Sequence, residues 1–135
     1  FLAKPASTQS NVGVNLNTDI AFGTEIFDQN GDFASSVFTA PVTGKYQLSA
    51  NIFMQDVQDF YSYLELIIQT SNRSYINQIS PLAMFDADGV ITVTYSILAD
   101  MDASDTAKVT VNIPNEGSNQ LDIHTYSHFS GYLAC

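Results

Sequence analysis

The chain of 135 residues is 45% apolar, which is enough for one domain (1–135) with a packed core that needs neither a metal nor a disulfide. Four Lys and Arg residues stand against fourteen Asp and Glu residues, and this net charge of −10 argues against a nucleic-acid partner, because phosphate binding depends on clustered basic side chains. No apolar run approaches the roughly 20 residues of a membrane helix, and the single cysteine, Cys135, cannot form an internal disulfide.

The start of the chain has neither the basic region nor the long apolar region of a signal peptide. It also lacks an initiator Met, so we expect a C-terminal fragment of a longer chain. Residues 1–3 are predicted to form a short strand, and the polar stretch 6–18 a loop. Residues 19–27 are predicted to form a strand that ends in a hairpin turn at Asn30-Gly31, because Asn-Gly is a strong hairpin signal.

The segment after Gly44 carries the clearest pattern in the sequence. Brief strands are predicted at Phe33 and at 37–38, followed by a turn in which Gly44 supplies a positive φ. From there to Met54 apolar and polar residues alternate strictly, as on a strand with one face in a core. The residues predicted to face that core are Tyr46, Leu48, Ala50, Ile52 and Met54, and Phe53 is the exception on the polar face.

The remaining chain alternates between apolar stretches and turn residues. Strands are predicted at 60–70, 73–79, 90–98, 107–113 and 121–134, and the β-branched run 90–98 is expected to be buried on both faces. No stretch of helical length shows a 3.6-residue period. Short strands with polar turns between them predict an all-β sandwich or jelly roll of about ten strands.

Two groups of residues resemble the signature of the C1q/TNF-like jelly-roll family. The first comprises Phe22, Asp28, Phe33, Phe38 and the sequence Gly44-Lys45-Tyr46, with a gap between Phe33 and Phe38 that is two residues shorter than usual in the family, and the second is Ser-His-Phe-Ser-Gly-Tyr-Leu at 127–133. The resemblance implies a C1q/TNF-like jelly-roll sandwich of antiparallel strands that assembles as a homotrimer. Gly131 in the second group fits a strand position where another group approaches the backbone closely.

Three short sequence segments are more similar to microbial and phage-encoded C1q-like domains than to animal ones. They are Thr39–Tyr46, Thr70–Tyr75 and Met101–Ala107. Such domains resemble the distal heads of virion fibres and of bacterial surface proteins. The resemblance therefore implies an extracellular location or one on the surface of a virion.

Alternation also predicts an interface between copies. It leaves aromatic residues on the outward sides of the strand after Gly44 and of the strands 90–98 and 121–134, and the C1q-like resemblance implies that these three strands lie together in one inner sheet. A large exposed aromatic patch is typical of an interface. The residues predicted for the trimer interface are Phe53, Tyr95, Tyr126, His128 and Tyr132.

Paired carboxylates on turns are candidates for a metal site. Carboxylate oxygens are suitable ligands for Ca²⁺, and some C1q-like heads hold calcium in this way. The candidates are Asp86 with Asp88, and Asp100 with Asp102 and Asp105. The alternative is that these acids are simply solvated turn residues.

The loops are the candidates for ligand binding, because loops on a rigid β-scaffold vary without cost to the core. Asp56, Asp59, Phe60 and Tyr61 are the residues predicted to contact a ligand, and the turn at 100–105 is a second candidate region. No nucleophile elbow, glycine-rich phosphate loop or Cys–His arrangement is present, so we predict a binding protein and not an enzyme.

The predicted function is that of a trimeric recognition head on a fibre or stalk, which binds a cell-surface glycan or protein receptor. Two alternatives remain open at this point. The domain could be a structural cap that trimerises a fibre and binds no ligand, or a secreted animal C1q-like defence lectin.

Overall fold

The computed structural model describes residues 1–12, 15–58, 61–81, 89–114 and 120–135, and these ranges contain thirteen β-strands and no α-helix. Within them, no helix is long and apolar enough to cross a membrane. The predicted all-β class is confirmed. The strands are β1 (Leu2–Lys4), β2 (Gln9–Val12), β3 (Thr18–Asp19), β4 (Thr24–Phe27), β5 (Phe33–Ala34), β6 (Val37–Thr39), β7 (Gly44–Gln55), β8 (Leu64–Thr70), β9 (Ser74–Ile79), β10 (Ile91–Met101), β11 (Thr106–Asn112), β12 (Leu121–Ile123) and β13 (His128–Leu133).

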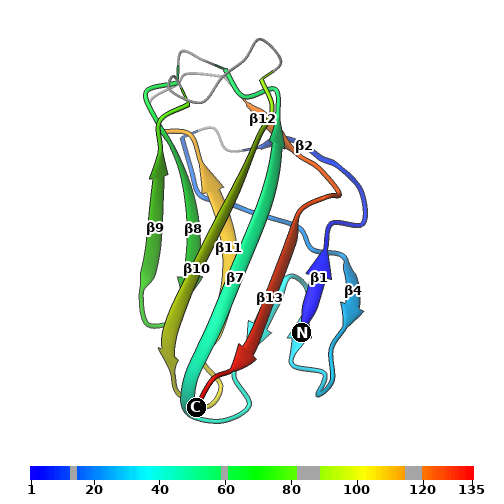
Figure 1. Ribbon diagram of the computed structural model, residues 1–135, viewed down its shortest axis with the longest axis vertical. Helices are drawn as coiled ribbons and strands as arrows, with labels where there is room; N and C mark the ends of the chain where they lie inside the picture. Colours follow the sequence, from blue (N-terminus) through cyan, green and yellow to red (C-terminus); the bar gives the residue numbers. More distant parts are fainter. Residues whose placement is uncertain (13–14, 59–60, 82–88, 115–119) are drawn as a thin grey trace.

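The strands form two antiparallel sheets that pack as a sandwich (Figure 1). One sheet has seven strands in the order β2-β12-β7-β13-β1-β4, with β10 paired to the other side of β7, and is called the β7 sheet here. The other sheet has six strands in the order β5-β6-β11-β8-β9, with β3 paired to β11, and is called the β11 sheet. Strands β10 and β9 are therefore border strands of the two sheets.

Strand β7 holds its sheet together because it has neighbours on both sides. It pairs with β10 from Gly44 to Met54, and on its other side with β13 and β12. Its burial alternates along nearly its whole length, as the sequence predicts. The five residues predicted to face the core are all at most 1% exposed.

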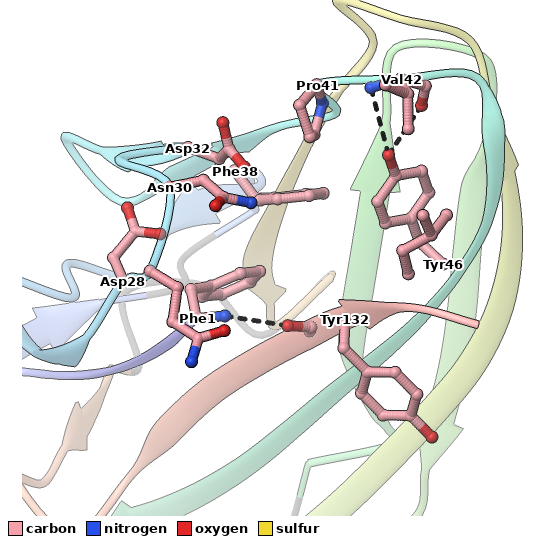
Figure 2. Close-up of a pocket in the computed structure, with 12 residues that line it drawn as sticks. Phe1, Asp28, Asn30, Asp32, Phe38, Pro41, Val42, Tyr46 and Tyr132 are labelled. Carbon is pink, nitrogen blue, oxygen red and sulfur yellow. Dashed lines mark hydrogen bonds between the residues drawn. The ribbon is translucent and has the colours of Figure 1, made fainter. Parts of the chain in front are cut away.

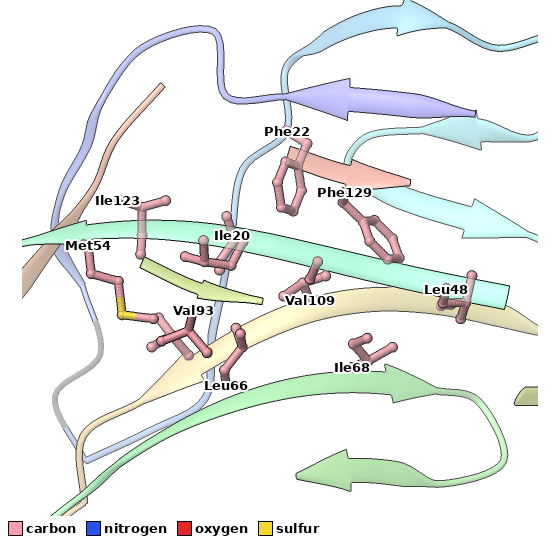
Figure 3. Close-up of a cluster of buried hydrophobic side chains, with 14 of the residues drawn as sticks. Ile20, Phe22, Leu48, Met54, Leu66, Ile68, Val93, Val109, Ile123 and Phe129 are labelled. Atoms are coloured by element: carbon pink, nitrogen blue, oxygen red, sulfur yellow. The ribbon is translucent and has the colours of Figure 1, made fainter. Parts of the chain in front are cut away.

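The core lies between the two sheets and is closed by side chains from both (Figure 3). Leu48 and Met54 of β7 face Leu66 and Ile68 of β8 across the sandwich. Near the chain ends, the ring of Phe129 lies 5.1 Å from that of Phe1 and 5.8 Å from that of Phe22, measured between centroids. This aromatic cluster brings residues from the beginning, the first third and the end of the chain together.

The N-terminal third differs from the prediction in three ways. The stretch 6–18 is not a plain loop, since it contains β2. The predicted strand 19–27 is divided into β3 and β4, which belong to different sheets, and Ile20 and Phe22 are buried where the chain crosses between them. The Asn30-Gly31 turn closes no hairpin, because β4 pairs with β1 whereas β5 pairs with β6. It carries the chain from one sheet to the other, and Gly31 has the positive φ of 74° that such a turn needs.

At two positions glycine is required because neighbouring atoms leave no room for a Cβ. Gly44 does not have the predicted positive φ; a Cβ there would instead lie 2.6 Å from Leu133 Cδ1 and 2.7 Å from the Cys135 carbonyl oxygen. At Gly131 a Cβ would lie 2.7 Å from Leu48 Cδ2 and 2.8 Å from Phe1 Cε1. The close approach predicted for Gly131 is therefore present.

The last third also differs from the prediction in two places. Strand β10 is buried on one face only, because apolar and polar residues alternate along it as they do on β7. The closing segment 121–134 is two strands, β12 and β13, separated by a turn. Leu133 is 47% exposed, although it is in phase with the fully buried Phe129.

Candidate interaction surfaces

The outward face of the β7 sheet is polar at its centre. Partners in an antiparallel ladder point to the same face, so the register places the outward side chains of β7 and β10 next to one another. The hydroxyls of Ser49 and Ser96 are 2.7 Å apart, and Thr94 Oγ1 donates a hydrogen bond to Asn51 Oδ1 at 2.7 Å. These four polar side chains therefore form hydrogen bonds with one another across the two strands.

The same face becomes apolar beyond β13. Two shallow cavities of about 230 and 380 Å³ open there, and His128 and Leu2 line both of them. Phe27, Tyr126 and Tyr132 around them are 51%, 70% and 65% exposed. The apolar side chains of this region, called the face surface below, are Leu2, Ile26, Phe27, Tyr126 and Tyr132.

An aromatic cluster extends the face surface towards β7. The Phe53 and Tyr126 ring centroids are 5.6 Å apart, and His124 lies 5.2 Å from the former and 4.3 Å from the latter. The backbone N–H of Tyr126 donates to His124 Nδ1 at 3.2 Å. Of the five residues predicted for the trimer interface, the structure therefore places Phe53, Tyr126, His128 and Tyr132 on one side of one sheet.

Tyr95 was predicted to join this patch, and that placement is wrong. Tyr95 pairs with Ala50, which is fully buried, whereas Phe53 pairs with Thr92. Tyr95 therefore points to the core side of the sheet. The alternation of β10 contains this information, because it puts Tyr95 in phase with the buried Ile91 and Val93.

Tyr95 instead lies on β10, which is a border strand of the β7 sheet, as β9 is of the β11 sheet. Tyr75, Tyr95 and Ile97 are partly buried against the core. Burial raises the pKa of the Tyr75 phenol above its ordinary value of 10.0. Leu98 is 55% exposed on the adjoining outward side. These side chains, Tyr75, Tyr95, Ile97 and Leu98, are called the edge surface below.

The two candidate ligand loops lie at opposite ends of the sandwich. The pairing of β7 with β10 puts residues 55–58 at one end and the turn after Met101 at the other. Asp56 is exposed with a φ of 57°, whereas Asp59 and Phe60 lie outside the described residues. Tyr61 is only 1% exposed, and its hydroxyl donates to the Gln120 carbonyl oxygen at 3.1 Å. The prediction that Tyr61 contacts a ligand is therefore wrong, because the ring is part of the core.

The acidic turn after β10 is internally hydrogen-bonded. Asp105 accepts hydrogen bonds from Ser71 Oγ at 2.7 Å, Asn72 Nδ2 at 2.6 Å and the Asp102 backbone N–H at 2.7 Å. Asp100 forms an ion pair of 3.0 Å with Arg73.

Among the residues that the structure describes, no three His, Cys, Asp or Glu side chains form a group that could hold a metal ion. The Ca²⁺ site predicted from Asp100, Asp102 and Asp105 is therefore not formed. Its other candidates, Asp86 and Asp88, lie outside the described residues.

The hydrogen bonds to Asp105 predict an acid-dependent contribution to stability. Donation by Ser71, and then by the Asp102 backbone, lowers the pKa of Asp105 below its ordinary value of 3.8. A lowered folded-state pKa stabilises the fold above the unfolded value, and this stability is lost as the pH falls through the folded value. The Asp105→Asn variant is therefore expected to lose less thermal stability than wild type between about pH 5 and pH 2.5. Equal losses in both proteins, measured by circular dichroism, would show that Asp105 makes no such contribution.

A further cavity that the sequence did not indicate opens beside the β4–β5 turn (Figure 2). Its volume is about 410 Å³. Asp28, Asn30 and Asp32 line one wall, and the apolar side includes Phe38 and Pro41. Asp28 is already engaged, since its Oδ2 accepts the Phe33 backbone N–H at 2.8 Å. These residues come from the β4–β5 turn, from β6 and from the turn after β6, so no local motif identifies the cavity.

No protein-family model and no curated protein matches the chain. Solved structures do resemble it. The globular domain of zebrafish complement 1qA is 16% identical with a TM-score of 0.70, over 100% of this chain and 96% of that one. Murine APRIL is 12% identical with a TM-score of 0.65, over 96% and 93% of the two chains. Rabbit GITRL is 8% identical with a TM-score of 0.51, over 78% and 76%. The chain therefore has the C1q/TNF-like jelly-roll fold that its sequence resembles.

Proposed function

We propose that this C1q/TNF-like domain is a homotrimeric recognition head, which ends a fibre or stalk and binds a glycan or protein receptor on a cell surface. The three sequence segments similar to microbial and phage-encoded domains favour a microbial or phage-encoded fibre. Such a head would be located outside the cell or on the surface of the virion. The domain acts by binding and not by catalysis.

One observation carries the trimer: the chain has two unlike apolar surfaces that its own fold leaves uncovered. The face surface lies around β1, β4 and β13 on one side of the β7 sheet, and the edge surface lies on β10 at the other border of that sheet and on the neighbouring border strand β9 of the β11 sheet. A contact between the face of one copy and the edge of the next is heterologous, and such contacts form a ring when the rotation from copy to copy closes. Three is the number of copies that the C1q/TNF resemblance implies.

The receptor contact is proposed at the end of the sandwich that carries residues 55–58. The C-terminal residue Cys135 lies at the opposite end, where its carbonyl oxygen accepts the Lys45 N–H at 2.7 Å (Figure 1). In a trimer three copies of the loop would stand around one axis, and three weak contacts then act together. Asp56 and Gln58 are the exposed side chains of the described part of this loop.

The test measures binding by the isolated domain. Wild type is expected to have three times the single-chain mass of 14.7 kDa in light scattering and to bind a glycan array or host cells. Replacing Asp56 and Gln58 with Ala should weaken that binding by about tenfold or more and leave the mass unchanged.

The control is Asp32→Ala, which removes the same charge from the cavity beside the β4–β5 turn. Loss of binding in this control alone would move the receptor site to that cavity. A trimer that binds neither glycans nor cells would favour the structural cap.

A further inference from the structure

His128 lies at the middle of the face surface. It stands opposite Asn51 on the outward side of the β7 sheet and lines both shallow cavities. Ile26 and Tyr126 border it on one side, and Phe27 and Tyr132 on the other. A neighbouring copy seated on the face surface would therefore cover the imidazole.

The charged side chain that lines these cavities is positive, since strand β1 contributes Lys4 to one of them. Strand β7 contributes the neutral Asn51, and β4 contributes only apolar side chains to the two cavities. Among the residues that the structure describes, no carboxylate lines either cavity, so a protonated His128 has no counter-ion from them.

The edge surface of a neighbouring copy offers little negative charge that could balance a protonated His128. Along β9 and β10 the only charged residue is Asp100, near the end of β10 beside Lys45. Its carboxylate is already paired with Arg73 at 3.0 Å. The edge surface itself carries no charged side chain, since its polar groups are the phenols of Tyr75 and Tyr95.

We propose that His128 makes the trimer acid-sensitive: the face surface accepts a neighbouring copy when this imidazole is neutral and releases it when the imidazole is protonated. This inference rests on the trimer of the proposed function. Histidine side chains change charge within the physiological pH range, and burying an ion without a partner is strongly unfavourable.

The size of the effect follows from linkage. If only the neutral form is covered, the association constant falls in proportion to the neutral fraction of the imidazole in each of the three copies. A tenfold fall in that fraction therefore lowers the trimer association constant about 1000-fold. At about pH 5.5 ordinary carboxylates stay ionised, which separates the effect from a general acid transition.

The experiment measures mass by analytical ultracentrifugation at pH 7.5 and 5.5, with circular dichroism to follow folding. Wild type is expected to be a trimer at pH 7.5 and largely a folded monomer at pH 5.5. His128→Asn should be a trimer at both values, and His128→Lys a monomer at both. The matched control His124→Asn, with the neighbouring imidazole removed, should keep the acid response of wild type.

The outcomes separate the two proposals. A wild-type monomer at pH 7.5 contradicts the proposed trimer itself. A trimer that persists at pH 5.5 leaves that proposal intact and overturns the role of His128. The role is also overturned if His128→Asn dissociates as wild type does, if His124→Asn alone abolishes the response, or if wild type and His128→Asn unfold equally at pH 5.5.

Discussion

Mixing a chain whose face surface is disrupted with a chain whose edge surface is disrupted is expected to give a dimer and no trimer. Phe27→Lys places a charge on the face surface, and Leu98→Lys places one on the edge surface. Both side chains are more than half exposed, so neither change should cost the fold more than about 0.5 kcal/mol. Each variant alone should be a monomer, because every contact in its ring contains one damaged partner.

The mixture restores one contact. The intact edge of the Phe27→Lys chain can meet the intact face of the Leu98→Lys chain, but the outer surfaces of this pair are both damaged. Sedimentation at high protein concentration should therefore show twice 14.7 kDa and nothing larger. Leu16→Lys is the matched control, since Leu16 is 60% exposed and belongs to neither surface; it should remain a trimer.

Other outcomes contradict a face-to-edge interface. If two faces met each other, the contact would be isologous, and Leu98→Lys would keep the mass of wild type on its own. If neither single variant changed the mass, both surfaces would be ordinary exposed apolar side chains.

Replacing Phe129 with Ala is expected to lower the free energy of unfolding by about 3–5 kcal/mol. The ring is fully buried and contacts three other rings, those of Phe1, Phe22 and Phe33. These come from both sheets and from the crossing between them, so their backbones restrict collapse around the vacated space. Unfolding in urea, followed by tyrosine fluorescence in the monomeric Phe27→Lys background, removes the concentration dependence of a trimer.

Ile76→Ala serves as its control. Ile76 is 53% exposed on β9, so its loss should change the free energy of unfolding by no more than about 0.5 kcal/mol. A cost below about 1 kcal/mol for Phe129→Ala would mean that the aromatic cluster is loosely packed or easily rearranged.

The sequence by itself determined the fold class, the central strand and its core face. Alternation from Tyr46 to Met54 is a local property of a strand with one buried side, and the structure confirms each position. The residues that carry the C1q/TNF resemblance lie at Phe22, at Phe38 and along β13, and the fold they imply is confirmed. Phe53 and Tyr126 were likewise expected to lie together.

The tertiary structure alone decided which surfaces these elements present. Tyr61 was predicted to contact a ligand, but its ring lies in the core, and the Asn30-Gly31 turn was predicted to close a hairpin, although it joins two sheets. Both depend on contacts between segments far apart in the chain, such as that between Tyr61 and Gln120. The edge surface has the same origin: alternation tells which residues of one strand share a face, but only the pairing of strands determines which strand is left at the border.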